Sequence, residues 1–132
     1  MNPEQPSLYL FDTTLLIDIA RGNGNAATVA SDLSRQGVAG TSVVNVAECL
    51  RGAHARERPF WDQMFGTLTV WPLDVTDAKL AGRTMYELAR AGFQVAIADA
   101  LIAATARRVQ ATVVTNNVRD FEHLGVPILK PA

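Results

Sequence analysis

Cysteine and histidine are nearly absent from this sequence. Cys49 is the single cysteine among 132 residues, and only two histidines accompany it. One thiol cannot close an internal disulfide, and this set of side chains is too small for a Cys/His zinc site. A chain without disulfides suits a reducing compartment, so we expect a cytoplasmic protein.

Long apolar runs and glycine-rich phosphate loops are also missing. No run approaches the roughly 20 apolar residues of a membrane-spanning helix, so we expect no membrane segment. The opening residues, MNPEQPSLYLFD, have no basic region followed by an apolar stretch, which argues against a signal peptide. Neither G-x-G-x-x-G nor a Walker motif occurs, which argues against a nucleotide-binding module.

The chain has no large excess of either charge. It contains 12 basic and 13 acidic residues, for a net charge of -1, so nucleic acid could bind only at a local patch. Hydrophobic residues make up 48% of the chain, which is enough for a core and argues against disorder. This length, without internal repeats or linkers, predicts one domain over residues 1–132.

What the sequence does contain is a series of short apolar runs that alternate with amphipathic segments. Strands are predicted at residues 8–11, 38–41, 68–73, 112–115 and 127–129. Helices are predicted at residues 14–20, 26–36, 42 to about 54, 60–65, 77–90 and 97–109, with Ser42 and Thr76 as N-caps. This alternation predicts an α/β fold with a mostly parallel sheet, whose site lies beyond the carboxyl ends of the strands.

Four acidic residues stand out because of where they fall. Asp12 directly follows the first predicted strand, and Asp120 lies in the polar cluster TNNVRD after a late one. Glu48 and Asp99 lie within predicted helices, and Asp99 is almost the only polar residue of IADALIAATA. Ordinary explanations exist, because each Asp could cap a helix and Glu48 could be solvated. Asp120 could also pair with Arg119.

Gathered at one edge of the sheet, the four carboxylates would instead form a site. Two ionised carboxylates about 4 Å apart repel by roughly 4 kcal/mol at an effective dielectric constant of about 20, so such a cluster needs a compensating cation. A set of acidic oxygens suits a hard divalent ion, Mg2+ or Mn2+. Such an ion polarises phosphates and activates water, which favours phosphodiester hydrolysis.

Four segments, in this order, resemble the PIN-domain family: LFDTTLLID, TSVVNVAECLRG, IADALIAATA and TNNVRDFE. The resemblance is closest to the VapC toxins of bacterial toxin–antitoxin pairs, and it covers residues 8 to about 129. It implies a PIN-like three-layer α/β/α sandwich with a mostly parallel central sheet. It also implies an Mg2+-dependent endoribonuclease, with Mn2+ as the alternative ion.

The resemblance assigns roles to the acidic residues. Asp12, Glu48 and Asp99 match the three main acidic positions, which implies that they are catalytic and hold the metal. Thr14 matches a small hydroxyl or amide position near the first acid.

The fourth region departs from the pattern of some relatives. These carry an acid two residues after the threonine, where this chain has the neutral amide of Asn117. Thr115 and Asn117 are therefore expected to orient water or phosphate, and Asp120 is the candidate for the fourth catalytic acid.

Three partners are implied as well: an RNA substrate, a VapB-type antitoxin that places a basic side chain among the acids, and a second copy of the chain in a homodimer. In the segment RGAHARER, the candidates to hold RNA phosphates are Arg51, Arg56 and Arg58. A solvated helix end explains these arginines equally simply. Trp61 and Trp71 are expected in the core or at an interface, and together with Phe65 they could supply apolar contact area for the dimer.

Two other functions are compatible with parts of this pattern. A haloacid-dehalogenase-like phosphatase also has an Asp after its first strand, but it needs a second Asp two residues later, where this chain has Thr14. The other rival is a catalytically degenerate PIN-like module that binds RNA or protein. The presence of all three main acids argues against degeneration.

Overall fold

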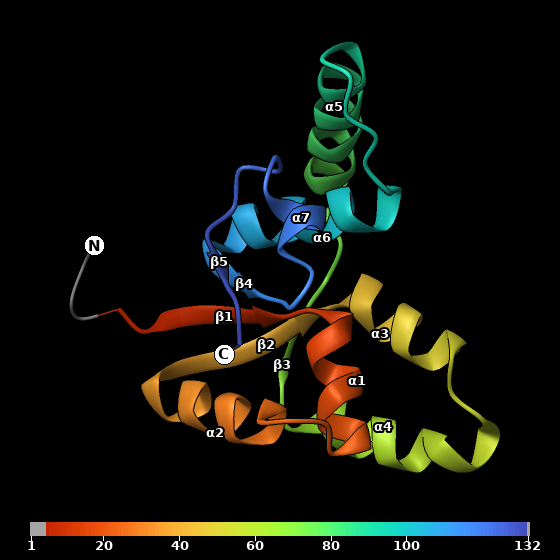
Figure 1. Cartoon of the computed structure of the whole chain (residues 1–132), viewed down its shortest axis with the longest axis vertical. Coiled ribbons are helices and arrows are strands. Elements are labelled where there is room, and N and C mark those ends of the chain that lie inside the picture. Colours follow the sequence, from red (N-terminus) through yellow and green to blue (C-terminus); the bar gives the residue numbers. More distant parts are fainter. Residues whose placement is uncertain (1–4, 132) are drawn as a thin grey trace.

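The structure is a computed structural model that describes residues 5–131, and it contains one five-stranded sheet flanked by helices (Figure 1). The strands are β1 (Ser7–Phe11), β2 (Gly37–Ser42), β3 (Thr69–Trp71), β4 (Ala111–Val114) and β5 (Ile128–Leu129). The helices are α1 (Thr13–Arg21), α2 (Ala26–Gln36), α3 (Val43–Arg51), the 3-10 helix η1 (Ala55–Glu57), α4 (Arg58–Gly66), α5 (Val75–Arg90), α6 (Ile97–Val109) and α7 (Val118–Phe121). Within residues 5–131, none of these helices has the length and hydrophobicity needed to cross a bilayer.

The sheet is parallel throughout its described pairings. Its strand order is β3-β2-β1-β4-β5, with Leu10 of the central strand β1 opposite Gly40 of β2 and Val113 of β4. The carboxyl ends of the five strands therefore share one edge, where loops and helix starts converge. This confirms the predicted α/β class and its parallel sheet.

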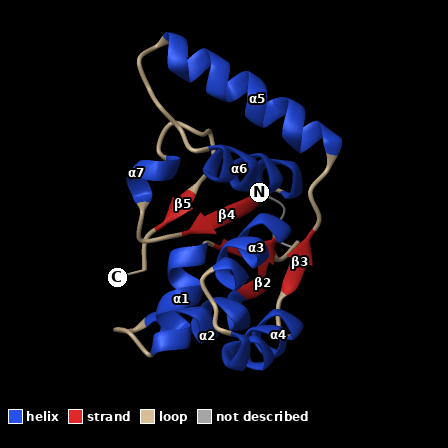
Figure 2. Ribbon diagram, turned by 90° about the vertical axis from the view of Figure 1, so that its right-hand side faces the viewer, coloured by secondary structure: helices blue, strands red, loops and turns tan. Residues whose placement is uncertain are grey.

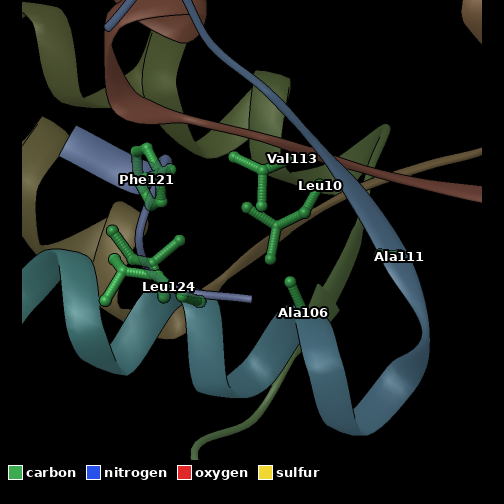
Figure 3. Packing of buried hydrophobic residues seen from close by; sticks show 8 residues of the cluster. Leu10, Ala106, Ala111, Val113, Phe121 and Leu124 are labelled. Carbon is green, nitrogen blue, oxygen red and sulfur yellow. The ribbon is translucent and has the colours of Figure 1, made fainter. Parts of the chain in front are cut away.

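Alternation along the strands divides the core between two faces of the sheet. Leu10 and Val113 point to one face, where they pack with residues of α6 and α7 (Figure 3). Their neighbours Phe11 and Val114 point to the other face and pack with residues of α1 to α4. Figure 1 shows α6 and α7 above the sheet, with α1, α2 and α4 below it. The result is the three-layer sandwich that the sequence predicted.

Helix α5 is attached to this sandwich through α6 (Figure 2). Ala81 of α5 packs against Ala100 and Ala104 of α6, and all three are buried. An ion pair between the exposed Arg108 and the buried Asp77 adds to this contact, because Arg108 Nε donates to Asp77 Oδ1 at 2.9 Å. Small side chains and one charged pair thus hold the longest helix of the chain.

Two predicted N-caps have different outcomes. Ser42 caps α3 as expected, since its hydroxyl accepts from the backbone N–H of Asn45 at 3.2 Å, although the helix ends at Arg51 rather than near residue 54. Thr76 as the cap of α5 is wrong. Asp74 caps that helix and accepts from the backbone N–H of Thr76 at 2.9 Å, while Asp77 closes a capping box from the third position.

The predicted source of dimer contact area needs a correction. Trp61 is only 4% exposed and lies in the core below the sheet, stacked on Phe65 at 5.7 Å between ring centroids. Phe65 and Trp71 are half-buried against the two core clusters. Of the two alternatives for Trp61, core and interface, the structure shows the core, which the sequence could not decide because it does not show which way a large apolar residue points.

Candidate active site

Asp12 lies at the carboxyl end of the central strand, in the N-cap position of α1. Its side chain makes no capping hydrogen bond, and it is only 5% exposed. Two other side chains hold the carboxylate instead. Asn45 Nδ2 donates to Oδ1 at 3.2 Å, and Thr115 Oγ1 donates to Oδ2 at 2.7 Å. These donors come from α3 and from the end of β4, so Asp12 is a junction of three chain segments.

The polar stretch after β4 lies against this carboxylate. Thr115 is fully buried, and its hydroxyl also accepts from the backbone N–H of Asn117 at 3.0 Å. Thr14 Oγ1 lies 3.4 Å from both Thr115 Oγ1 and Asp12 Oδ2. The side chain of Asn117 is exposed. The polar stretch therefore forms a wall beside Asp12, and it also leads into α7. The sequence did not predict this short helix.

Glu48 is connected to Asp12 through hydroxyl and amide groups. It lies half-buried on α3, and its Oε1 accepts from Thr13 Oγ1 at 2.8 Å. Thr13 Oγ1 in turn accepts from Asn45 Nδ2 at 3.0 Å, the same amide nitrogen that donates to Asp12. The simple explanation of a solvated glutamate therefore does not describe Glu48.

Thr13 and Asn45 were not predicted as site residues. Asn45 is fully buried, and its Oδ1 accepts from Ser42 Oγ at 2.6 Å, which fixes the direction of the amide. The signal that would have found it is its spacing. Asn45 lies three residues before Glu48 on the same helix face and three after the N-cap Ser42.

Asp99 and Asp120 complete the acidic group. Helix α6 begins at Ile97, so the half-buried Asp99 belongs to its first turn and does not cap it. Burial raises the pKa of Asp99 to about 7, and the negative charges of Asp120, Asp12 and Glu48 add to the rise, in that order. Asp120 is exposed on α7, and no ion pair with Arg119 is found among residues 5–131. The four acids thus act on one another electrostatically.

The surroundings of Asp12 have the same negative character. Burial raises the pKa of Asp12, and the hydrogen bond from Thr115 offsets part of that rise. The pKa of the buried Cys49 thiol is raised to about 12 by burial and by the charges of Glu48 and Asp12. Cys49 is therefore a neutral core residue at physiological pH.

The donor chemistry of this group fits a hard divalent cation, because its carboxylate oxygens repel one another and a cation would offset that repulsion. Within residues 5–131, no three Asp, Glu, His or Cys side chains lie close enough together to chelate one ion directly. The ligand set of Asp12, Glu48 and Asp99 stays a prediction.

Of the three candidate arginines, Arg56 is the one that lines a cavity together with Glu48. Arg51 ends α3 and Arg58 begins α4, and both are exposed. Arg56 contributes to a cavity of about 350 Å3 whose wall also includes Glu48 and Phe60. No ion pair of these arginines is found in the described part of the chain, and their role in binding RNA stays a prediction.

Replacing Thr115 with valine is expected to destabilise the protein by about 2 kcal/mol at pH 7, because Asp12 loses its shortest hydrogen bond while the volume is kept. The loss is expected to shrink as the pH falls towards 4, since a protonated Asp12 depends less on this donor. Urea unfolding of Thr115→Val and of the exposed control Thr69→Val measures the effect. Equal losses at both pH values would contradict it.

The parallel sheet of order β3-β2-β1-β4-β5, with an acidic group at its carboxyl edge, defines the class of the protein. It is an α/β/α domain whose candidate site is built from carboxylates. The chain belongs to the PIN-domain family, whose model matches residues 9–127. The PIN-like fold expected from the four sequence segments is thereby confirmed.

The chain is also similar to individual proteins, one by sequence and two by fold. The chain is 34% identical over 117 residues to Ribonuclease VapC19 of Mycobacterium tuberculosis, covering 86% of this chain and 92% of the relative. Its fold is similar to a chain of DNA-bound VapBC from Salmonella typhimurium, with a TM-score of 0.79, 26% identity, and coverage of 96% and 98%. A chain of VapBC2 from Rickettsia felis, bound to a promoter DNA fragment, gives a TM-score of 0.84 at 20% identity, with coverage of 95% and 99%.

Proposed function

We propose that this PIN domain is a metal-dependent endoribonuclease and the toxin of a VapBC-type toxin–antitoxin pair. The observation that carries the proposal is the hydrogen-bond network that joins Asp12 to Glu48 through Asn45 and Thr13 at the carboxyl edge of the sheet. The negative charges of both acids also help to raise the pKa of Asp99. Similarity to a protein named as a VapC ribonuclease supports RNA as the substrate. Mg2+ is the expected ion, with Mn2+ as an alternative.

In this proposal, Asp12, Glu48 and Asp99 would hold the cation, and Asp120 would add negative charge beside it. Such an ion supplies Lewis acidity towards the phosphate and a lowered pKa for attacking water. The protein's own groups orient the site. Thr115 and Asn45 fix the two oxygens of Asp12, and Thr13 fixes Glu48. Preorganised ligands need little rearrangement when the substrate arrives.

The proposed antitoxin acts on the same acids. A carboxylate group without a bound cation is a suitable receptor for an Arg or Lys side chain, which would offset part of its charge and block RNA. Similarity to chains from VapBC structures supports a partner of this kind. We also propose a homodimer, whose apolar contacts would come from exposed side chains such as Ile97 and Val75.

The purified protein is expected to cut RNA internally with Mg2+ or Mn2+, and EDTA is expected to reduce cutting to background. Gel analysis of total RNA, with Asp12→Asn as the inactive control, measures this. A degenerate binding module would instead retain RNA without cutting it.

Expression of the wild type, but not of Asp12→Asn, is expected to slow bacterial growth. Active protein that leaves growth unchanged would refute the toxin role, and no metal-dependent cutting would refute the nuclease.

A further inference from the structure

A cavity lies directly beside two members of the acidic group, Asp99 and Asp120. It has a volume of about 280 Å3 and lies between the loop after α5, the first turn of α6, and α7. Its wall includes Asp99 and Asp120, so it is continuous with the candidate active site. In Figure 2 the loop that leaves α5 descends towards α6 and α7.

An exposed aromatic pair forms part of the same wall. The ring of Phe93 lies 4.2 Å from that of His123 between centroids, at an interplanar angle of 36°. Phe93 is 43% exposed, and the His123 side chain is 42% exposed. The backbone N–H of Phe93 donates to Leu88 O at 2.8 Å, which ties the loop to the end of α5. Two rings from separate segments thus face solvent beside the acids.

The charges around this cavity restrict what it can hold. Three carboxylates, those of Asp99, Asp120 and Glu122, lie on its wall, against the single permanent cation of Arg119. A phosphate group would be repelled there. A neutral ring system would not be repelled, and carboxylates readily accept hydrogen bonds from the N–H groups of a base edge.

We propose that this cavity is a nucleobase subsite, which holds one unpaired base of the RNA next to the cleaved bond by stacking on Phe93 and His123. The inference rests on the proposed function and adds the two side chains that would hold the base. Unpaired bases commonly stack on Phe and His side chains, whereas paired bases in a duplex are not free to do so. The volume lies near the lower end of ligand pockets, about 300–1,000 Å3, which suits one ring system rather than a nucleotide pair.

The test uses oligoribonucleotides that span a mapped cut site, each with one base removed. Wild-type protein is expected to lose about 5- to 150-fold in kcat/KM when the base beside the cut is missing, the range expected for stacking of one base. Phe93→Ala is expected to show a smaller loss for the same substrate, because its subsite is already impaired. Phe93→Trp should restore the full loss. Tyr86→Ala serves as the matched control, because it removes a 63% exposed ring that lies on α5 and does not line the cavity.

A second measurement keeps the subsite separate from cleavage. In an Asp12→Asn background, whose substitution lies outside the cavity wall, 2-aminopurine placed at the base position should be quenched on binding. Quenching should be lost with Phe93→Ala or His123→Ala and kept with Tyr86→Ala. The subsite would be overturned if removing the base lowered kcat/KM equally in the wild type and in Phe93→Ala. It would also be overturned if quenching were the same with and without the Phe93→Ala substitution. If the wild type binds RNA with this quenching but never cuts it, the proposed nuclease function fails while the subsite stands.

Discussion

Replacing Asp99 with asparagine is expected to reduce RNA cleavage by at least about a thousandfold and, in metal-free protein, to raise the melting temperature. The substitution removes a proposed metal ligand, and with it several kcal/mol of transition-state stabilisation. The same change removes a half-buried charge that Asp120, Asp12 and Glu48 repel. Activity and stability therefore move in opposite directions.

The pH dependence follows from the raised pKa of Asp99. In the unfolded chain this carboxyl ionises near 3.8, and in the folded protein near 7. Metal-free wild type therefore loses stability as pH rises from about 4 to about 7, and it loses no more above that range through this group. Asp99→Asn should lack this part of the slope. The difference in melting temperature is thus expected to grow between pH 4 and pH 7.

Differential scanning fluorimetry in EDTA, across this pH range, measures the effect. The matched control is Asp62→Asn, because Asp62 is an exposed acid on α4. Added Mn2+ should stabilise the wild type more than Asp99→Asn. A variant that melts below the wild type in EDTA at pH 7 would instead indicate a structural role for Asp99.

Replacing Arg108 with methionine is expected to destabilise the protein by about 3 kcal/mol at pH 7. Asp77 is 1% exposed and loses its charged partner, while the weaker donors, the Thr105 hydroxyl at 3.3 Å and the backbone N–H of Asp74 at 2.9 Å, remain. Leaving the buried charge of Asp77 without its partner is costly, since the interior solvates a carboxylate poorly. Helix α5 is expected to be the region affected, because this pair joins it to α6.

Urea unfolding, with hydrogen exchange to localise the loss, measures this second effect. Arg83→Met, which removes an exposed arginine of α5, is the control and should change stability by less than about 0.5 kcal/mol. The double variant Asp77→Asn/Arg108→Met should recover much of the loss, because no buried charge is then left unpaired. An Arg108→Met protein as stable as the control would show that the pair contributes little.

The sequence predicted the fold class because alternating apolar runs and amphipathic segments are local features of the chain. It singled out the four acids as candidates because a carboxylate at a strand end or in an apolar helix is conspicuous, and their roles stay predictions. It did not identify Thr13 and Asn45, since a hydroxyl and an amide have many ordinary uses and their role depends on neighbours brought together by folding. For the same reason it could not show that Trp61 points into the core.

The hydrogen bond between Thr115 and Asp12 spans 103 positions of the sequence, and it joins the end of the central strand β1 to the end of β4. A nascent chain has Asp12 and Glu48 long before it has Thr115 or β4. During synthesis, the candidate site therefore cannot be completed until residue 115 has left the ribosome.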